Sequence, residues 1–160
     1  MCGIAGILSF DDVPDIDVGR RMLARLAHRG PDGSGLYRDG HVLLGHTRLA
    51  IVDLAGGAQP MSNEDGSVWV TFNGEIFNHV ELRQELSALG HCFRTSSDTE
   101  VIVHAWEEWA QECFSRFNGQ WSLAIWERDD RRLVLARDRL GVRPLYLTRD
   151  RGGVVFASEV

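Results

Sequence analysis

The chain has 160 residues, 44% of them hydrophobic and 25% charged, which is enough to form one domain with a buried core. Its 17 basic residues are all arginine, and the absence of lysine excludes Schiff-base chemistry, a P-loop lysine and a Ser–Lys nucleophile. The 23 acidic residues leave a net charge of −6, which argues against nucleic acid or an anionic membrane as a partner.

The first third of the chain predicts strands around one helix. Cys2–Phe10 is apolar and predicts a strand that begins next to the terminus, and Val18–His28 has apolar residues at helical spacing. Glycine and proline predict loops at His28–Gly35 and Gly56–Pro60. Between these loops, short apolar runs predict two strands, at Val42–Leu44 and Arg48–Asp53.

The middle of the chain predicts a strand followed by two helices. β-Branched and aromatic residues predict a strand at Val68–Phe72, which the turn-forming pair Asn73–Gly74 would end. A helix follows, from an N-cap at Asn78 to Gly90. The next helix begins at the capping box Ser97–Glu100, and its predicted buried face consists of Val101, Ile102, Ala105, Trp106, Trp109 and Ala110.

The last quarter predicts strands alone, at Trp121–Trp126, Leu133–Ala136, Leu145–Leu147 and Val154–Ala157. In the first of them Trp121, Leu123 and Ile125 point one way, and Ala124 and Trp126 point the other. A strand that is apolar on both faces must be covered on both faces. Together with the helices, this predicts an α+β domain of stacked sheets with helices outside, and no linker or repeat divides it.

The sequence contains no feature of a secreted or membrane protein. No stretch approaches the ~18–20 apolar residues of a membrane span, and the apolar start lacks the preceding basic region of a secretory signal. An odd number of widely spaced cysteines does not indicate a disulfide framework, so we expect a reducing cytoplasm. These cysteines are Cys2, Cys92 and Cys113.

Cys2 is the first candidate for chemistry. Removal of Met1 would leave Cys2 with a free α-amine, whose pKa of about 7.7–8.0 suits a base at neutral pH. The amine and the thiol that it activates would then belong to one residue, so no histidine is needed. The alternative is that Cys2 is a small, unreactive hydrophobic residue in an edge strand.

Two further groups have suitable donors and charges. Asn73 and Gly74 can offer an amide NH₂ and a backbone N–H to one oxyanion, although Asn-Gly is above all a turn signal. Arg48 suits a carboxylate, and Glu75 and Asp98 suit an ammonium, so together they can hold a free amino acid. Alternatively, Asp98 begins a helix and Arg48 forms a surface ion pair.

The histidines do not follow a metal-binding pattern, and neither a C-x-x-C nor an H-E-x-x-H motif occurs. Cys92 lies beside His91, but adjacent residues of a strand point to opposite faces. We therefore predict no metal site among the six histidines, which are His28, His41, His46, His79, His91 and His104.

The order of several short motifs resembles one family along the whole chain. Met1–Gly6 is similar to the start of class II glutamine amidotransferases, which use an N-terminal cysteine. The further matches resemble the glutaminase domain of asparagine synthetases, and they are His28–Gly33, Arg48–Asp53, Asn73–Asn78, Ser97–Glu100, Phe117–Gly119, Arg137–Tyr146 and Phe156–Glu159.

The resemblance implies an α+β fold of the N-terminal nucleophile hydrolase type, a four-layer α-β-β-α sandwich of two antiparallel sheets. It implies that Cys2 attacks the side-chain amide of L-glutamine, releases ammonia and forms a γ-glutamyl thioester, which water hydrolyses to glutamate. Asn73 and Gly74 would form the oxyanion hole. The substrate would be held by Arg48, by backbone groups of Ile51 and Val52, and by Glu75 and Asp98.

The resemblance also implies a partner. Residues 1–160 would be the glutaminase domain at the front of a longer cytoplasmic synthetase, which is expected to dimerise. This domain would need no cofactor or metal, and ATP and Mg²⁺ would bind only a C-terminal synthetase domain in cis. Ammonia would serve asparagine synthesis.

The chain departs from the family pattern at Thr47, Phe72, Phe77 and Gln120–Trp121, which bears on the final product more than on glutamine hydrolysis. Two alternatives therefore stay open. The domain belongs to another amidotransferase, which makes an amino sugar, a purine precursor or a natural-product amide, or it is a non-catalytic regulatory module with the same fold.

Overall fold

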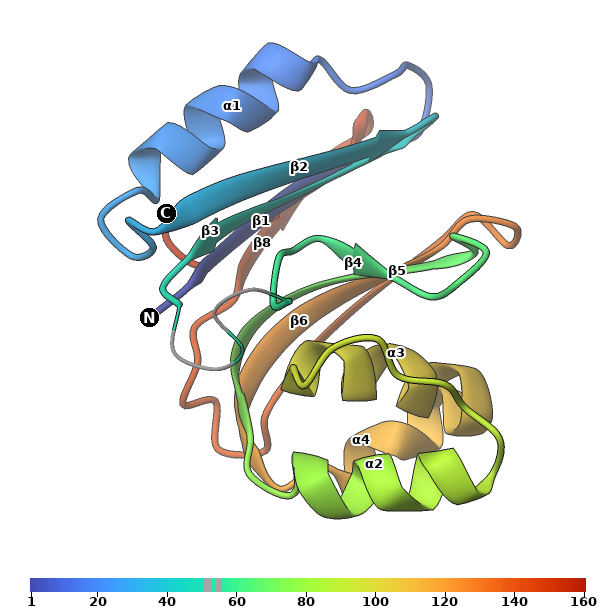
Figure 1. Cartoon of the computed structure of the whole chain (residues 1–160). Coiled ribbons are helices and arrows are strands. Elements are labelled where there is room, and N and C mark those ends of the chain that lie inside the picture. The colour runs from blue at the N-terminus through green and yellow to red at the C-terminus, as the bar shows by residue number, and fades with distance from the viewer. Residues whose placement is uncertain (51–52, 54–55) are drawn as a thin grey trace.

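Two antiparallel sheets lie face to face between two layers of helices in the computed structural model, which describes residues 1–50, 53 and 56–160 (Figure 1). The first sheet has the strand order β2-β3-β1-β9-β8 and the second the order β4-β5-β6-β7. The first sheet consists of β1 (Gly3–Ser9), β2 (Gly33–Asp39), β3 (Val42–Arg48), β8 (Tyr146–Arg149) and β9 (Gly153–Ala157). The second consists of β4 (Met61–Ser62), β5 (Val68–Ile76), β6 (Gly119–Glu127) and β7 (Arg132–Arg137). The expected four-layer α-β-β-α sandwich is confirmed.

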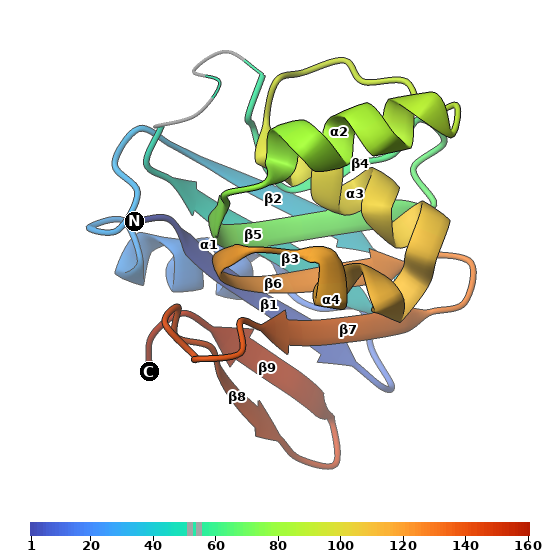
Figure 2. The same ribbon diagram turned by 90° about the horizontal axis from the view of Figure 1, so that it is seen from below.

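Helices cover the outer face of each sheet. α1 (Ile16–Arg25) lies on the first sheet, over β1, β2 and β3. The second sheet is covered by α2, α3 and α4 (Figure 2). These are α2 (His79–Ala88), α3 (Asp98–Trp109) and α4 (Cys113–Arg116), and a 3₁₀ turn, η1 (Ala110–Glu112), joins the last two.

Buried hydrophobic side chains gather in three clusters, one between each pair of neighbouring layers. The strand β6 contributes to two of them, as its two-faced pattern predicts. Trp121, Leu123 and Ile125 pack against the helices, whereas Ala124 and Trp126 pack between the sheets. The alternation along β6 therefore fixes which face meets which layer.

The glycine-rich segment predicted as a loop is partly a strand. β2 begins at Gly33 and pairs with β3 in continuous register, from Gly33 opposite Arg48 to Asp39 opposite Val42. At Gly35 a Cβ atom would lie 2.1 Å from the Gln59 carbonyl oxygen, so glycine allows a close approach of two backbones. The loop prediction for Gly33–Gly35 was wrong for this reason. The short β4 was not predicted either.

Two strand boundaries also differ from the prediction. Asn73–Gly74 does not end its strand, because β5 continues to Ile76 and pairs with β6 throughout. β3 extends to Arg48, and the described residues of the strand predicted at Arg48–Asp53 lie outside regular strands beyond that point.

The start of α3 uses a variant of the predicted capping box. The Ser97 hydroxyl accepts a hydrogen bond from the Thr99 N–H at 3.2 Å, which confirms Ser97 as the N-cap. The Glu100 carboxylate instead accepts the backbone N–H groups of Arg94 and Thr95, at 2.8 Å each. Asn78 occupies the N-cap of α2 as predicted, but its side chain makes no capping hydrogen bond.

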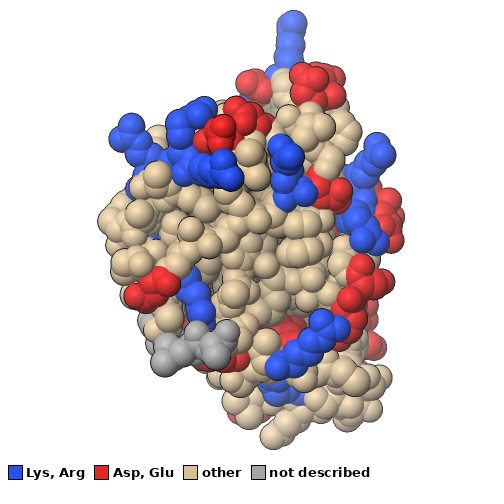
Figure 3. Space-filling model, turned by 45° about the horizontal axis from the view of Figure 1, so that its top comes forward, with Lys and Arg blue, Asp and Glu red and all other residues tan. Residues whose placement is uncertain are grey.

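The surface carries charges of both signs. In the view of Figure 3, arginine and acidic side chains lie interspersed around a broad uncharged area. None of the helices formed by the described residues has the length and hydropathy needed to cross a bilayer.

Candidate active site

A cavity opens where β1, β3 and β5 approach the first turn of α3. Six of the eight residues predicted as site residues line it, although they come from four separate parts of the sequence. They are Cys2, Arg48, Asn73, Gly74, Glu75 and Asp98. The other two, Ile51 and Val52, lie outside the described residues.

Cys2 directly precedes β1, which is the central strand of the first sheet and not an edge strand. Its thiol lies against the segment that follows β3. Sγ donates to the Leu49 carbonyl oxygen at 3.6 Å and accepts the Leu49 N–H at 3.4 Å. Two contacts to one residue hold the thiol in place at the cavity wall.

The backbone of Cys2 is held by Arg29, a buried residue that was not predicted as a site residue. Arg29 Nε donates to the Cys2 carbonyl oxygen at 2.9 Å, and Nη1 pairs with the Glu159 carboxylate at 2.7 Å. Arg29 and Glu159 lie in two separate motifs of the sequence. They meet only because β9 pairs with β1 in the fold, so the sequence alone did not reveal the contact.

Asn73 points into the layer between the sheets, beside its cross-strand neighbour Ser122. It is 1% exposed, and its Nδ2 group has no hydrogen-bond partner among the described residues. A buried amide donor without a partner is unfavourable unless a ligand supplies an acceptor. The amide is therefore available to an anionic oxygen in the cavity.

Gly74 follows Asn73 in the same strand and is required by close packing. A Cβ atom at Gly74 would lie 2.2 Å from the Gln120 carbonyl oxygen and 2.6 Å from the Trp121 Cα atom. Any other residue would push β5 away from β6. Asn73 and Gly74 thus lie within a strand, and not at the tight turn that their sequence indicates.

Asp98 is a buried carboxylate at the start of α3. Burial raises the pKa of its carboxyl, and the hydrogen bond that Oδ2 accepts from the Ile76 N–H at 3.1 Å only partly offsets this. The neighbouring charge of Glu75, an exposed residue, raises the pKa further. Two carboxylates on one cavity wall, one of them desolvated, favour a bound cation.

Arg48 is the last residue of β3, and two aspartates form hydrogen bonds with backbone groups around it. Asp32 accepts the Ala50 N–H at 2.8 Å and its own N–H donates to the Arg48 carbonyl oxygen. The Arg48 guanidinium donates to the Asp53 carbonyl oxygen. The Asp53 carboxylate in turn accepts the N–H groups of Gly56 and Ser96.

Two further polar residues line the cavity. His46 is 1% exposed, and its Nε2 atom has no partner among the described residues. Burial lowers the pKa of His46 to about 4, so the ring is neutral at pH 7. Gln59 accepts the Phe72 N–H at 2.7 Å and donates to the Thr99 hydroxyl at 3.0 Å, which ties β5 to α3.

The last wall of the cavity is the loop after β7. Each oxygen of the Asp138 carboxylate accepts two backbone N–H groups, those of Leu140 and Val142 and those of Trp121 and Arg143. This loop brings Arg143 to the cavity, where its guanidinium contacts the Met1 sulfur. Met1 itself lines the cavity beside the thiol.

These groups suit one class of ligand. A guanidinium and two carboxylates match the carboxylate and ammonium of a free amino acid. A thiol and an unpartnered amide donor match an acyl group with a developing oxyanion. Within the described part of the chain, the one set of three potential metal ligands lies outside this cavity.

Comparisons with known proteins point to one family. A family model described as "Glutamine amidotransferase domain" matches residues 1–160. The chain is 42% identical, over its whole length, to asparagine synthetase [glutamine-hydrolyzing] 3 of Bacillus subtilis. It is 44% identical, over 99% of its length, to asparagine synthetase [glutamine-hydrolyzing] 1 of Lotus japonicus. In each case it spans 27% of the relative's length.

A solved structure has the same fold. The glutamine phosphoribosylpyrophosphate amidotransferase of B. subtilis, solved with ADP and GMP, superposes on 98% of the chain with a TM-score of 0.80. The identity is 25%, and 42% of that chain is covered.

Proposed function

Since the chain belongs to the glutamine amidotransferase domain family, we propose that its cavity hydrolyses the side-chain amide of L-glutamine to glutamate and ammonia. One observation carries the proposal: the Cys2 thiol and the unpartnered Asn73 amide line one cavity together with groups that match an amino acid. This combination would be costly in a purely structural core.

The nucleophile is the Cys2 thiol, after an aminopeptidase has removed Met1. The new α-amine of Cys2 takes the thiol proton, and Sγ attacks the amide carbon of glutamine. The amine then gives that proton to the leaving nitrogen, so ammonia departs and a γ-glutamyl thioester remains. Water, deprotonated by the same amine, attacks the thioester and releases glutamate with the thiol restored.

The oxyanion of both tetrahedral intermediates binds Asn73 Nδ2 and the Gly74 N–H. Pairing of β5 with β6 fixes the backbone that carries both donors. The donors therefore need little reorganisation when charge develops on the oxygen.

The amino acid end of glutamine is held by charge. Arg48 binds the α-carboxylate, together with backbone groups of Ile51 and Val52. Asp98 and Glu75 bind the α-ammonium, and a bound cation offsets the unfavourable burial of the Asp98 carboxylate.

The ammonia serves an ATP-dependent, Mg²⁺-dependent synthetase domain in the same polypeptide, most simply for asparagine synthesis. The basis is the length of the curated relatives, of which this chain spans 27%, and their printed name. A thiol nucleophile and three free cysteines suit the reducing cytoplasm.

A glutaminase domain for another acceptor is the second candidate. The similarity to a phosphoribosylpyrophosphate amidotransferase, with a TM-score of 0.80, favours it. The name of that protein indicates a different ammonia acceptor, although its chain contains a domain of the same fold. Assays of ammonia transfer to aspartate, with ATP and Mg²⁺ and the full-length protein, separate the two candidates.

Glutamate release from glutamine tests the hydrolysis itself. We expect Cys2→Ala to abolish release, whereas Cys92→Ala, at an exposed thiol elsewhere, leaves it unchanged. Mass spectrometry of the N-terminus should show that active protein lacks Met1. Undiminished release by Cys2→Ala would overturn the proposal. Glutamine binding without hydrolysis by a processed sample would identify a regulatory module instead.

A further inference from the structure

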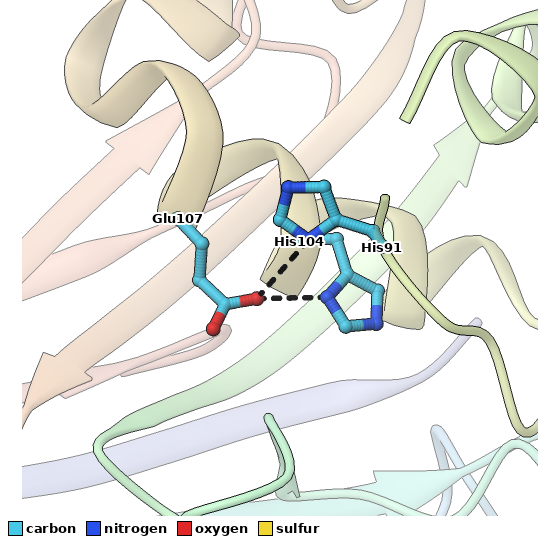
Figure 4. Close-up of side chains that lie close together, drawn as sticks. All are labelled: His91, His104 and Glu107. Carbon is cyan, nitrogen blue, oxygen red and sulfur yellow. Dashed lines mark hydrogen bonds and ion pairs between the residues drawn. The ribbon is translucent and has the colours of Figure 1, made fainter. Parts of the chain in front are cut away.

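Two histidines and a glutamate converge on the helical side of the second sheet, away from the glutamine cavity. His104 and Glu107 lie on α3, and His91 lies in the loop after α2 (Figure 4). Glu107 Oε2 is 2.7 Å from His104 Nδ1 and 3.8 Å from His91 Nδ1. One ligand atom from each residue lies within 4.8 Å of the other two.

The backbone fixes all three residues before any ligand binds. His104 and Glu107 are three positions apart on a helix, so their side chains share one face. His91 is fixed by the end of α2, where its N–H donates to the Leu86 carbonyl oxygen at 3.0 Å after Gly90 has turned the chain with a φ of +106°. The cluster is therefore held by regular structure on both sides.

Burial and ring contacts restrict the histidines further. The His104 side chain is 2% exposed, and the Phe93 ring meets it edge to face with centroids 4.7 Å apart. The His91 side chain is 17% exposed and that of Glu107 25%, so an ion from solvent can reach the three ligand atoms.

Each of the three side chains has an acidic or amide partner on its far side. His91 Nε2 lies 3.1 Å from the Glu108 carboxylate, and His104 Nε2 lies 3.9 Å from that of Glu64. Asn63 Nδ2 donates to the other oxygen of Glu107 at 2.8 Å. Carboxylates on the far nitrogen of a histidine are the usual outer partners of metal-binding imidazoles, because they leave the near nitrogen free to bind.

We propose that His91, His104 and Glu107 form a binding site for a divalent transition-metal ion of the Zn²⁺ type. Two imidazoles and one carboxylate are a ligand set that zinc accepts, with a water molecule in the fourth position. Zinc bonds of about 2.0–2.2 Å place tetrahedral ligand atoms roughly 3.3 Å apart. Oε2 and His104 Nδ1 must separate slightly, and His91 Nδ1 must approach, which side-chain rotations allow.

The site is distinct from the glutamine cavity, which meets α3 at Asp98. His104 is six residues further along the helix, about 9 Å along its axis. A bound ion would join the loop after α2 to α3 and thereby stabilise the native state. Sequence spacing missed the set, because His91 reaches the other two ligands only through the packing of α2 on α3.

Calorimetric titration of Zn²⁺ into chelator-treated protein tests the proposal without any assay of glutamine hydrolysis. We expect one equivalent to bind and the melting temperature to rise with Zn²⁺ concentration. His91→Ala and Glu107→Gln should each weaken binding at least tenfold. Glu108→Gln, which removes only an outer partner, should weaken it about 10–100-fold.

His28→Ala is the matched control, because His28 also pairs with a glutamate but lies in the turn after α1, the helix that packs on the first sheet. It should bind Zn²⁺ as the unsubstituted protein does, and so should Cys92→Ser. Far-UV circular dichroism of each metal-free variant establishes that it is folded. Failure of folded protein to bind Zn²⁺ saturably, or one-equivalent binding that survives both His91→Ala and Glu107→Gln, would overturn the proposal.

Discussion

His46 shows how one buried residue can make stability depend on pH. Its side chain extends the row of Val42 and Leu44 on the inner face of β3, and it makes a hydrogen bond with the backbone of Phe72 across the sandwich. Burial holds the pKa of His46 at about 4, with the nearby Arg48 charge acting in the same direction. In an unfolded chain the pKa is about 6.5.

The first prediction concerns acid unfolding. Between pH about 6.5 and about 4 the unfolded state binds a proton that the native state does not, so stability falls as the pH falls through this window. The loss due to His46 is about 3 kcal/mol. Urea unfolding from pH 8 to pH 4 measures it, and His46→Gln should reduce the slope. Parallel pH profiles for the two proteins would contradict the assignment.

A second prediction concerns Asn73, whose amide is proposed to bind the oxyanion. Asn73→Ala should lower kcat for glutamate release about 10²–10³-fold, with a much smaller change in KM, because the donor acts after substrate has bound. Ser122→Ala is the control, since Ser122 is the cross-strand neighbour and also lacks a partner for its hydroxyl among the described residues. An equal loss in both variants would point to packing.

Helices and strands with a regular apolar pattern were predicted well, whereas those that depend on contacts between distant segments were not. The Ser97 cap and the helical period placed α3, and the alternation of apolar residues placed β6 and its two buried faces. The predicted buried face of α3 was wrong at its end, because α3 ends at Trp109 and Ala110 is exposed in the 3₁₀ turn η1. β2 was missed because its glycines serve close contacts with other segments. The glycine after Asn73 marked a turn in the sequence, yet it is needed because β6 packs against it.

The same distinction holds for the candidate site. Five of the six described residues that were predicted have side chains whose chemistry is evident from type and motif, and Gly74 was predicted for its backbone N–H. His46 and Gln59 make contacts with residues that are distant in sequence, so no local pattern identified them. Arg29 was part of the motif His28–Gly33, but its contacts with Cys2 and Glu159 appear only in the fold. Asp138 was part of a motif, but its four N–H contacts appear only in the folded loop.

The loop after β7 gives a third prediction. Asp138→Ala would leave four backbone N–H groups without their charged acceptor, and we expect a loss of about 2–3 kcal/mol in the free energy of unfolding. Asp129→Ala, in an exposed pair with Arg128, should change it by less than about 0.5 kcal/mol. Denaturant titrations of both variants measure the difference. Similar values would show that the loop does not depend on Asp138.

In the whole molecule, the first and last strands of the chain, β1 and β9, lie side by side in the middle of the first sheet. Phe156 of β9 is 1% exposed and lies over Gly6 of β1, where a Cβ atom would come within 2.4 Å of its ring. The two chain ends are also tied by Ser158, whose hydroxyl accepts the Ile4 N–H at 3.0 Å. The stability of the whole domain therefore depends on the contact between its first and last strands.

The fourth prediction follows from that dependence. Phe156→Ala should lower the free energy of unfolding by about 3–5 kcal/mol, because it leaves a cavity between two sheets. Its neighbour Val155 faces outward and is 38% exposed, so Val155→Ala should cost less than about 1 kcal/mol. Urea denaturation followed by tryptophan fluorescence measures both. Equal effects would contradict the central position of Phe156.

The pairing of β1 with β9 also sets an order in time. Residues 153–157 leave the ribosome about 150 residues after Cys2, which at ~5–20 residues per second is a delay of roughly 8–30 s. Until then β1, the strand that directly follows Cys2, lacks one of its two neighbours. The removal of Met1 that the proposed mechanism requires can therefore take place before the sheet beside Cys2 is complete.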